Sequence, residues 1–452
     1  MWDFFSNFVS RKTSLFMPLE QKKKKYRIRW GRVIIAFLIV VVLPIVLLVR
    51  CLCGDDEVQS VSPEAAVRQL TPQDLRCDTV MEHRIDSFVH SPQRLDSALI
   101  SISMLDLTTG NSIYKMQSDR LFPPASCMKI VTAMAAIKTL GINYRYRESL
   151  QIRGKMVADT LKGNLLLCAE ADPLLLSLDT LVKQLRAKGI RHIDGNVYVD
   201  LEIAERLVGH PSSKTWDIPY NKLPVLLKGS KYVLNNLIAT LRANGISYHR
   251  NPDIRPTEKY HIVAQSSSSL REAVAQMLIH SSNIKAEAIS YHLDYKAGLV
   301  RNHCQRWDVK HYIETFLCNT FAADSAAMVG IVVNDGSGLS PQNRLTADFL
   351  VRLLDYAYHD EVLKDYFIDE ALATPGVPER RGSLMGRMAR ADYRGRVFVK
   401  TGTLTTIGSS SLAGFLHGFD DHWYAFAIVN ADSPVAESRI YQDKICKLVM
   451  KN

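Results

Sequence analysis

The chain has 452 residues, 47% of them hydrophobic and 23% charged, which is ordinary for a globular protein and enough for two or three domains. Its net charge of +10 is concentrated in residues 1–32, where nine basic residues stand against Asp3 and Glu20. Because the remainder is nearly balanced, the charge does not indicate nucleic-acid binding by the folded part.

An uninterrupted apolar run extends from Val33 to Val49, a length at the lower limit for a membrane-spanning helix. A cleavable signal peptide fits less well, because the preceding segment is too long and no small-x-small site follows. We therefore expect a transmembrane signal anchor at 33–49 in the inner (cytoplasmic) membrane and a basic cytoplasmic tail at 1–32. A linker at 50–76 then leads to a body on the outer, periplasmic side.

The body begins with a first part of the expected catalytic domain, residues 77–143. A short helix over 80–89 precedes strands at 98–107 and 112–117, joined by a turn. A helix that is apolar almost all round follows from Ser126 and ends at Gly141, which predicts a core position. A hairpin followed by a buried helix is how a sheet packed on a helical core begins.

Residues 144–263 have shorter elements and predict a small inserted α+β accessory domain. Strands are expected at 150–157, 163–169 and 193–199, and helices at 180–188, capped by Asp179, and at 233–244.

Residues 264–452 form the second part of the catalytic domain. The predicted helices are 270–279, 284–292, 316–328, 347–358 and 437–450, and the predicted strands are 397–404, 411–417 and 423–430. A tight loop over 335–340 is expected to be a structural turn rather than a catalytic loop.

The eight cysteines do not form a dense disulfide framework. A pair between Cys304 and Cys318 and two free buried thiols both remain open. No metal-ligand motif such as H-E-x-x-H occurs, and we expect no metal or other cofactor.

Ser126 and Lys129 form an S-x-x-K pattern at the start of the apolar helix. The two side chains are one turn apart on one face, so an amine lies beside a hydroxyl, as a serine nucleophile requires when no histidine is its base. The pattern alone is weak, because it recurs at 112–115 and 282–285. The competing interpretation is a helix N-cap followed by a solvated lysine.

Two more motifs follow in order, S-x-N at Ser281/Asn283 and K-T-G at Lys400-Thr401-Gly402. The first separates two predicted helices and the second lies on a predicted strand. This ordered set, with S-x-x-K first, is that of penicillin-recognising serine enzymes.

The chain resembles serine D-alanyl-D-alanine carboxypeptidase/endopeptidases of the penicillin-binding protein 4 type, the class C low-molecular-mass penicillin-binding proteins. Further matching stretches lie at 124–139, 163–173, 189–200, 335–343 and 382–404, and the resemblance spans about residues 85–450. It implies an α+β, penicillin-binding/β-lactamase-like serine transpeptidase fold, with an antiparallel sheet packed on a helical core.

The sequence departs from this family in two places. Ser282 stands where the family usually has aspartate. Only about 80 residues separate Asp200 from Ser281, so the accessory region is reduced relative to the family.

The resemblance implies catalytic roles for three residues. Ser126 attacks a carbonyl and forms an acyl-enzyme. Lys129 is the general base, with its pKa lowered by burial, by the helix N-terminus and by Lys400. Ser281 relays a proton to the leaving amine.

The resemblance also implies that the remaining motif residues bind substrate. Asn283 is expected to hold the substrate amide, and Lys400 to attract a terminal carboxylate, with Thr401 and Thr403 beside it. Gly402 leaves the strand edge bare for a peptide. The N–H groups of Ser126 and Thr403 form the expected oxyanion hole, whereas the neighbouring Cys127 is expected to pack rather than react.

These features predict a membrane-anchored serine peptidase that acts on peptidoglycan stem peptides and is acylated by β-lactam inhibitors. A β-lactamase and a non-catalytic envelope-binding protein on the same fold are the alternatives. The sequence does not separate carboxypeptidase from endopeptidase activity.

Overall fold

The computed structural model describes residues 72–450 apart from 92–94, 97–98, 174–176, 204–224, 299–311, 322–325, 327 and 391–392. The predicted tail, the predicted span at 33–49 and most of the linker lie outside the described residues. Within the described ranges, no helix combines the length and hydrophobicity needed to cross a membrane.

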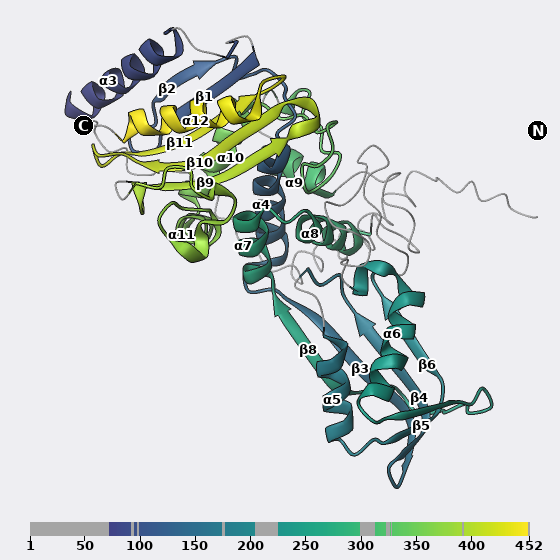
Figure 1. Ribbon diagram of the computed structural model, residues 1–452. Helices are drawn as coiled ribbons and strands as arrows, with labels where there is room; N and C mark the ends of the chain where they lie inside the picture. Colours follow the sequence, from purple (N-terminus) through teal and green to yellow (C-terminus); the bar gives the residue numbers. More distant parts are fainter. Residues whose placement is uncertain are drawn as a thin grey trace, which may run out of the picture. The chain divides into compact units, whose positions relative to one another are not determined.

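A five-stranded sheet joins the two ends of the described chain (Figure 1). Its order is β2-β1-β11-β10-β9, and all neighbouring strands are antiparallel. The register pairs Ile100 with Asn430 and Asp106 with Tyr424 across β1 and β11. The strands are β1 (Ile100–Asp106), β2 (Ser112–Met116), β9 (Val397–Leu404), β10 (Ser409–His417) and β11 (Trp423–Asn430). The predicted antiparallel sheet and α+β class are confirmed.

The two faces of this sheet bury different side chains. Large residues such as Met104 and Phe426 share one core with α3 (Pro72–Val89) and α12 (Val435–Val449). The opposite face presents Ala413, Ala425 and Ala427 to the helical core, together with the larger Phe398 and Phe415. Because alanine carries only a methyl group, helices can approach this face closely.

The helical core consists of α4 (Met128–Leu140), α7 (Leu270–His280), α8 (Asn283–Lys296), α9 (Tyr312–Thr320), α10 (Ala347–His359) and α11 (Glu361–Tyr366). Every residue of α4 from Met128 to Ile137 is buried, as its apolar composition predicts. The predicted helix over 316–328 is wrong in its bounds. It begins at Tyr312, where Asp294 accepts the backbone N–H at 2.8 Å and satisfies a donor of the first turn.

The boundary of the predicted linker also differs. Helix α3 begins at Pro72 and not near Val80, so it includes the last residues assigned to the linker. Proline is well tolerated in the first turn of a helix, because the N–H that it lacks has no partner there.

A second sheet has the order β7-β5-β4-β3-β8, with β6 paired to β4. It mixes antiparallel and parallel pairs. With α5 and α6 it encloses a hydrophobic core of its own. The elements are β3 (Arg145–Val157), β4 (Thr160–Ala169), α5 (Leu178–Ala187), β5 (His192–Gly195), β6 (Val197–Leu201), α6 (Ser230–Ala243), β7 (Ser247–Arg250) and β8 (His261–Ser269).

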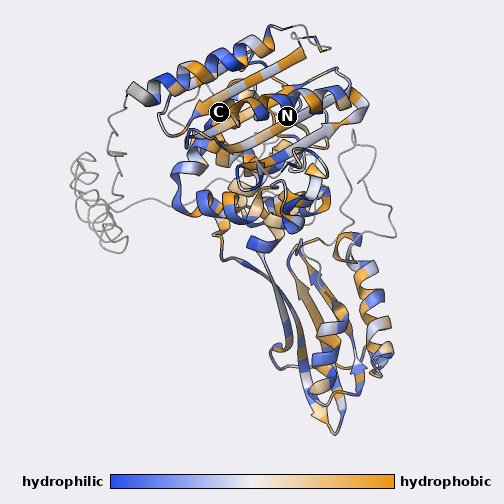
Figure 2. Ribbon diagram, turned by 60° about the vertical axis from the view of Figure 1, so that its left-hand side comes forward, coloured by the Kyte–Doolittle hydropathy of each residue, from blue (hydrophilic) through white to orange (hydrophobic). Residues whose placement is uncertain are grey.

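Two local predictions in this region are corrected. The strand expected at 193–199 is interrupted at Asn196, whose N–H donates to Asn164 Oδ1 at 3.1 Å, and becomes β5 and β6. Helix α5 is capped by Ser177 and not by Asp179. Its buried positions Leu178, Leu181, Val182 and Leu185 repeat at helical spacing. Figure 2 shows the expected mixture of hydrophobic and hydrophilic residues along the helices.

The described cysteines, at positions 77, 127, 168, 318 and 446, are free thiols. Cys318 is exposed and not buried as the second alternative assumed. Cys304 lies outside the described residues.

Helix α12 offers a matched test of the packing on the sheet. Ile445 is fully buried and Ile440 is 56% exposed. We expect Ile445→Ala to lower the free energy of unfolding by about 2–5 kcal/mol, because it leaves a cavity. We expect Ile440→Ala to change it by about 0.5 kcal/mol or less. Urea denaturation measures both, and equal losses would contradict this packing of α12.

Candidate active site

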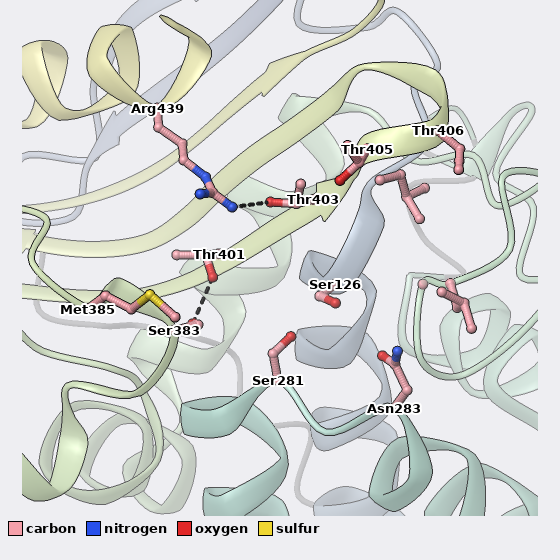
Figure 3. Close-up of a pocket in the computed structure, with 13 residues that line it drawn as sticks. Ser126, Ser281, Asn283, Ser383, Met385, Thr401, Thr403, Thr405, Thr406 and Arg439 are labelled. Atoms are coloured by element: carbon pink, nitrogen blue, oxygen red, sulfur yellow. Dashed lines mark hydrogen bonds between the residues drawn. The ribbon is translucent and has the colours of Figure 1, made fainter. Parts of the chain in front are cut away.

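The three sequence motifs meet at one cleft of about 480 Å³ (Figure 3). Ser126 comes from η3 (Ala125–Cys127), a short helical turn that leads into α4. Ser281 and Asn283 come from the junction of α7 and α8, and Thr401 and Thr403 come from β9. The lining residues are Ser126, Ser281, Asn283, Gly338, Leu339, Ser383, Met385, Thr401, Thr403, Leu404, Thr405, Thr406 and Arg439.

Lys129 lies directly beneath Ser126 and is fully buried. Its Nζ lies 3.0 Å from Ser126 Oγ, 2.6 Å from Asn283 Oδ1 and 2.5 Å from the Ser337 carbonyl oxygen. An ammonium would donate one hydrogen to each of these oxygens. A neutral amine has one hydrogen fewer and a lone pair, so it can instead accept the proton of the Ser126 hydroxyl.

The loop over 335–340 positions one of these acceptors. Asp335 accepts the N–H groups of Gly338 and Ser340, each at 2.6 Å, which fixes the turn. Gly338 has a φ of +77°, and a Cβ there would lie 1.8 Å from the Ala125 carbonyl oxygen. Asp335 therefore holds the loop as a tight turn, but the loop also lines the cleft and supplies the Ser337 carbonyl to Lys129, which the sequence did not indicate.

Three non-glycine residues with a positive φ stand at the site. Ala125, immediately before Ser126, has a φ of +49°, Ser281 has a φ of +55°, and Met385, which lines the cleft, has a φ of +50°. Such backbone costs about 1–3 kcal/mol and persists where the surroundings hold it. Ser281 ends α7, and Ser282 caps α8 by accepting the Lys285 N–H. Serine and aspartate are both good N-caps, so the Ser282 departure keeps this junction intact.

Lys400 lies under the cleft and not on its surface. It is fully buried, and its Nζ donates to Ser281 Oγ at 2.9 Å and to the Thr401 carbonyl at 2.6 Å. Burial, together with the charge of Lys129, lowers the pKa of Lys400 to about 7. The structure thus places Lys400 beneath the cleft, whereas the sequence predicted that it attracts a terminal carboxylate.

Gly402 lies next to the cleft but does not line it. A Cβ at this position would lie 2.1 Å from Ser411 Oγ and 3.0 Å from Ala125 Cβ. The glycine therefore allows β9 to pack closely against η3. On either side of it, the hydroxyls of Thr401 and Thr403 reach the cleft, and Thr401 Oγ1 donates to Ser383 Oγ at 2.7 Å.

Several residues that line the cleft were not predicted from the sequence as site residues, among them Leu339, Ser383, Met385 and Arg439. Leu339 and Ser383 lie in stretches that resemble the family, so the resemblance could have indicated these two. Arg439 comes from α12, and no motif marks it. Its Nη2 donates to Thr403 Oγ1 at 3.0 Å.

Among the described residues, one group of three side chains could hold a metal ion, Asp78, Asp106 and His422. None of them lines the cleft. Asp106 Oδ2 lies 2.5 Å from His422 Nδ1, and Asp106 Oδ1 accepts the Thr108 N–H at 2.7 Å. Burial and a hydrogen bond with Asp78 raise the pKa of Asp106 to about 6. These contacts connect α3, β1 and the loop before β11.

The antiparallel sheet on a helical core, with this serine–lysine cleft between them, defines the class of penicillin-recognising serine enzymes. Residues 81–224 and 224–450 match the D-Ala-D-Ala carboxypeptidase 3 (S13) family. The chain belongs to this family, and it is a serine peptidase of the penicillin-binding protein 4 type.

Individual proteins are similar to this chain in sequence or in fold. A D-alanyl-D-alanine carboxypeptidase of Actinomadura sp. (strain R39) is 22% identical over 446 residues, covering 78% of this chain and 81% of the relative. The crystal structure of penicillin binding protein 4 (dacB) from Haemophilus influenzae has a TM-score of 0.61 at 17% identity, covering 78% and 96% of the two chains. A predatory peptidoglycan endopeptidase from Bdellovibrio bacteriovorus has a TM-score of 0.50 at 16% identity, covering 77% and 90%.

The buried position of Lys400 predicts a pH-dependent contribution to stability. Its pKa is about 7 in the folded protein against 10.5 as the reference value. Between these values the unfolded chain binds more protons than the folded chain, so stability rises with pH. We expect the unfolding free energy of the wild type relative to Lys400→Met to increase by about 1 kcal/mol per pH unit between about pH 7 and pH 9. Urea denaturation across this range measures it, and a constant difference would contradict the burial.

Proposed function

We propose that the protein is a membrane-anchored serine DD-peptidase that cleaves D-Ala-D-Ala bonds of peptidoglycan stem peptides through an acyl-enzyme on Ser126. The observation that carries this proposal is the 3.0 Å contact between Ser126 Oγ and the buried Lys129 Nζ, at the floor of the cleft. Family membership supports the substrate class.

In the proposed acylation, neutral Lys129 takes the proton of Ser126 Oγ, and Oγ attacks the carbonyl carbon of the scissile amide. The N–H groups of Ser126 and Thr403 hold the oxyanion. Ser281 then protonates the leaving amine nitrogen and regains a proton from Lys400, 2.9 Å away. The C–N bond breaks, and Lys129 now carries the proton that Lys400 has lost.

Deacylation reverses these transfers. Water attacks the acyl carbonyl and gives one proton to neutral Lys400 through Ser281. Lys129 returns its proton to Ser126 Oγ as the ester bond breaks, and the peptide leaves as an acid. The lysine pair therefore carries one proton throughout the cycle, which fits two amines buried in one site.

The proposed acyl-enzyme is tested with a fluorescent penicillin. We expect wild-type protein to become covalently labelled, because β-lactams resemble the substrate amide, and we expect Ser126→Ala to lose the label completely. Ser112→Ala is the matched control, because Ser112 begins another S-x-x-K match, is exposed on β2 outside the cleft, and should leave labelling unchanged. The Haemophilus relative has been solved with a β-lactam bound. Labelling that persists in Ser126→Ala would exclude Ser126 as the nucleophile.

The proposed localisation is the inner membrane, with the catalytic part on the periplasmic side. It rests on the apolar run Val33–Val49 and the basic segment before it. We expect the full chain to sediment with membranes and to require detergent for release, because the run is long enough to span the hydrocarbon core. A variant without residues 1–49 should stay in the supernatant. Release of the full chain by high salt alone would contradict the anchor, since salt removes only electrostatic attachment.

A further inference from the structure

We propose that Arg439 binds the α-carboxylate of the leaving D-amino acid and so selects substrates that end in a free acid. The inference rests on the proposed function and deepens it. It assigns carboxylate recognition to a residue outside the three motifs, whereas the sequence indicated Lys400 for this task.

The charge distribution of the cleft points to Arg439. It is the one charged residue among those that line the cleft in the described part of the chain. Lys400 is fully buried beneath the cleft, and its Nζ is already hydrogen-bonded to Ser281 Oγ and to the Thr401 carbonyl, so it does not line the surface that a bound peptide contacts. An arginine remains protonated near neutral pH. The permanent positive charge facing a bound peptide is therefore that of Arg439.

The guanidinium is also placed beside the hydroxyls that would share the carboxylate. Arg439 Nη2 donates to Thr403 Oγ1 at 3.0 Å, and Figure 3 shows the side chain extending over β9 toward Thr403 and the cleft. Thr401 and Thr403 are two residues apart on β9, so their side chains lie on the same face. A guanidinium has five N–H donors, and one bond to Thr403 leaves four for a carboxylate.

Arg439 is available for a ligand and stands on a fixed element. Its side chain is exposed, and the structure pairs it with no carboxylate among the described residues. Helix α12 is held by Gln442, whose Nε2 donates to Asn430 Oδ1 at 2.9 Å, and by the ion pair of Asp443 with Arg387 at 2.7 Å. A recognition residue on a rigid helix loses little backbone freedom when the ligand binds.

The leaving group of the proposed reaction supplies the matching anion. Cleavage between two D-alanines releases an amino acid whose carboxylate is one carbon from the scissile nitrogen. A charge-assisted hydrogen bond between this carboxylate and the Arg439 guanidinium is worth about 1.5–3 kcal/mol, which corresponds to roughly a tenfold to hundredfold change in rate.

The test compares two acylated D-Ala-D-Ala peptides that differ only at the C-terminus, one a free acid and the other an amide. We expect Arg439→Gln to lower kcat/KM for the acid by roughly tenfold to hundredfold and to leave the amide unchanged. Arg439→Lys keeps the charge but not the planar guanidinium. We expect its kcat/KM for the acid to lie between the values of the wild type and of Arg439→Gln. Lys444→Gln is the control, because it removes a positive charge from the same helix outside the cleft.

Equal losses on both peptides, or no loss on either, would overturn the assignment of Arg439. If the wild type cleaves both peptides, that result leaves the proposed function standing. If the wild type cleaves neither peptide and takes no penicillin label, the proposed function fails and this inference fails with it.

Discussion

Two lysine amines, those of Lys129 and Lys400, are fully buried in one site, and the arrangement around them follows from that constraint. A buried ammonium is unfavourable unless oxygens surround it. Ser126, Asn283 and Ser337 supply such oxygens to Lys129, and Ser281 supplies one to Lys400. Burial, and after it repulsion from the charge of Lys129, lowers the pKa of Lys400 to about 7, so a second proton on the pair is disfavoured above this pH.

The fold places these acceptors by close backbone approach. A loop held by Asp335 lies against η3, and it can do so because Gly338 carries no side chain. Strand β9 approaches the same turn through Gly402. The alanines on one face of the first sheet let the helical core pack near it. The cleft therefore lies where a sheet edge, a helix start and a loop pack closely together.

Much of this fold and site could be predicted from local pattern. The apolar composition of α4 indicates its burial, and the order of Ser126, Ser281 and Lys400 predicts that the three motifs meet. Features set by distant contacts could not be predicted. The break at Asn196 depends on Asn164, and β8 (His261–Ser269), a largely polar strand, pairs with β3 without an apolar alternation.

The site was predicted less completely than the fold for the same reason. Arg439 reaches the cleft only because α12 packs on the first sheet, and no motif near Arg439 in the sequence indicates this packing.

The central claim, that catalysis requires one proton on the buried lysine pair, is tested most directly by the pH dependence of the acylation rate of Ser126 by a β-lactam. The account predicts a rate that rises with pH through about 7, as the pair loses its second proton. A rate that is constant from about pH 5 to about pH 8 would contradict it.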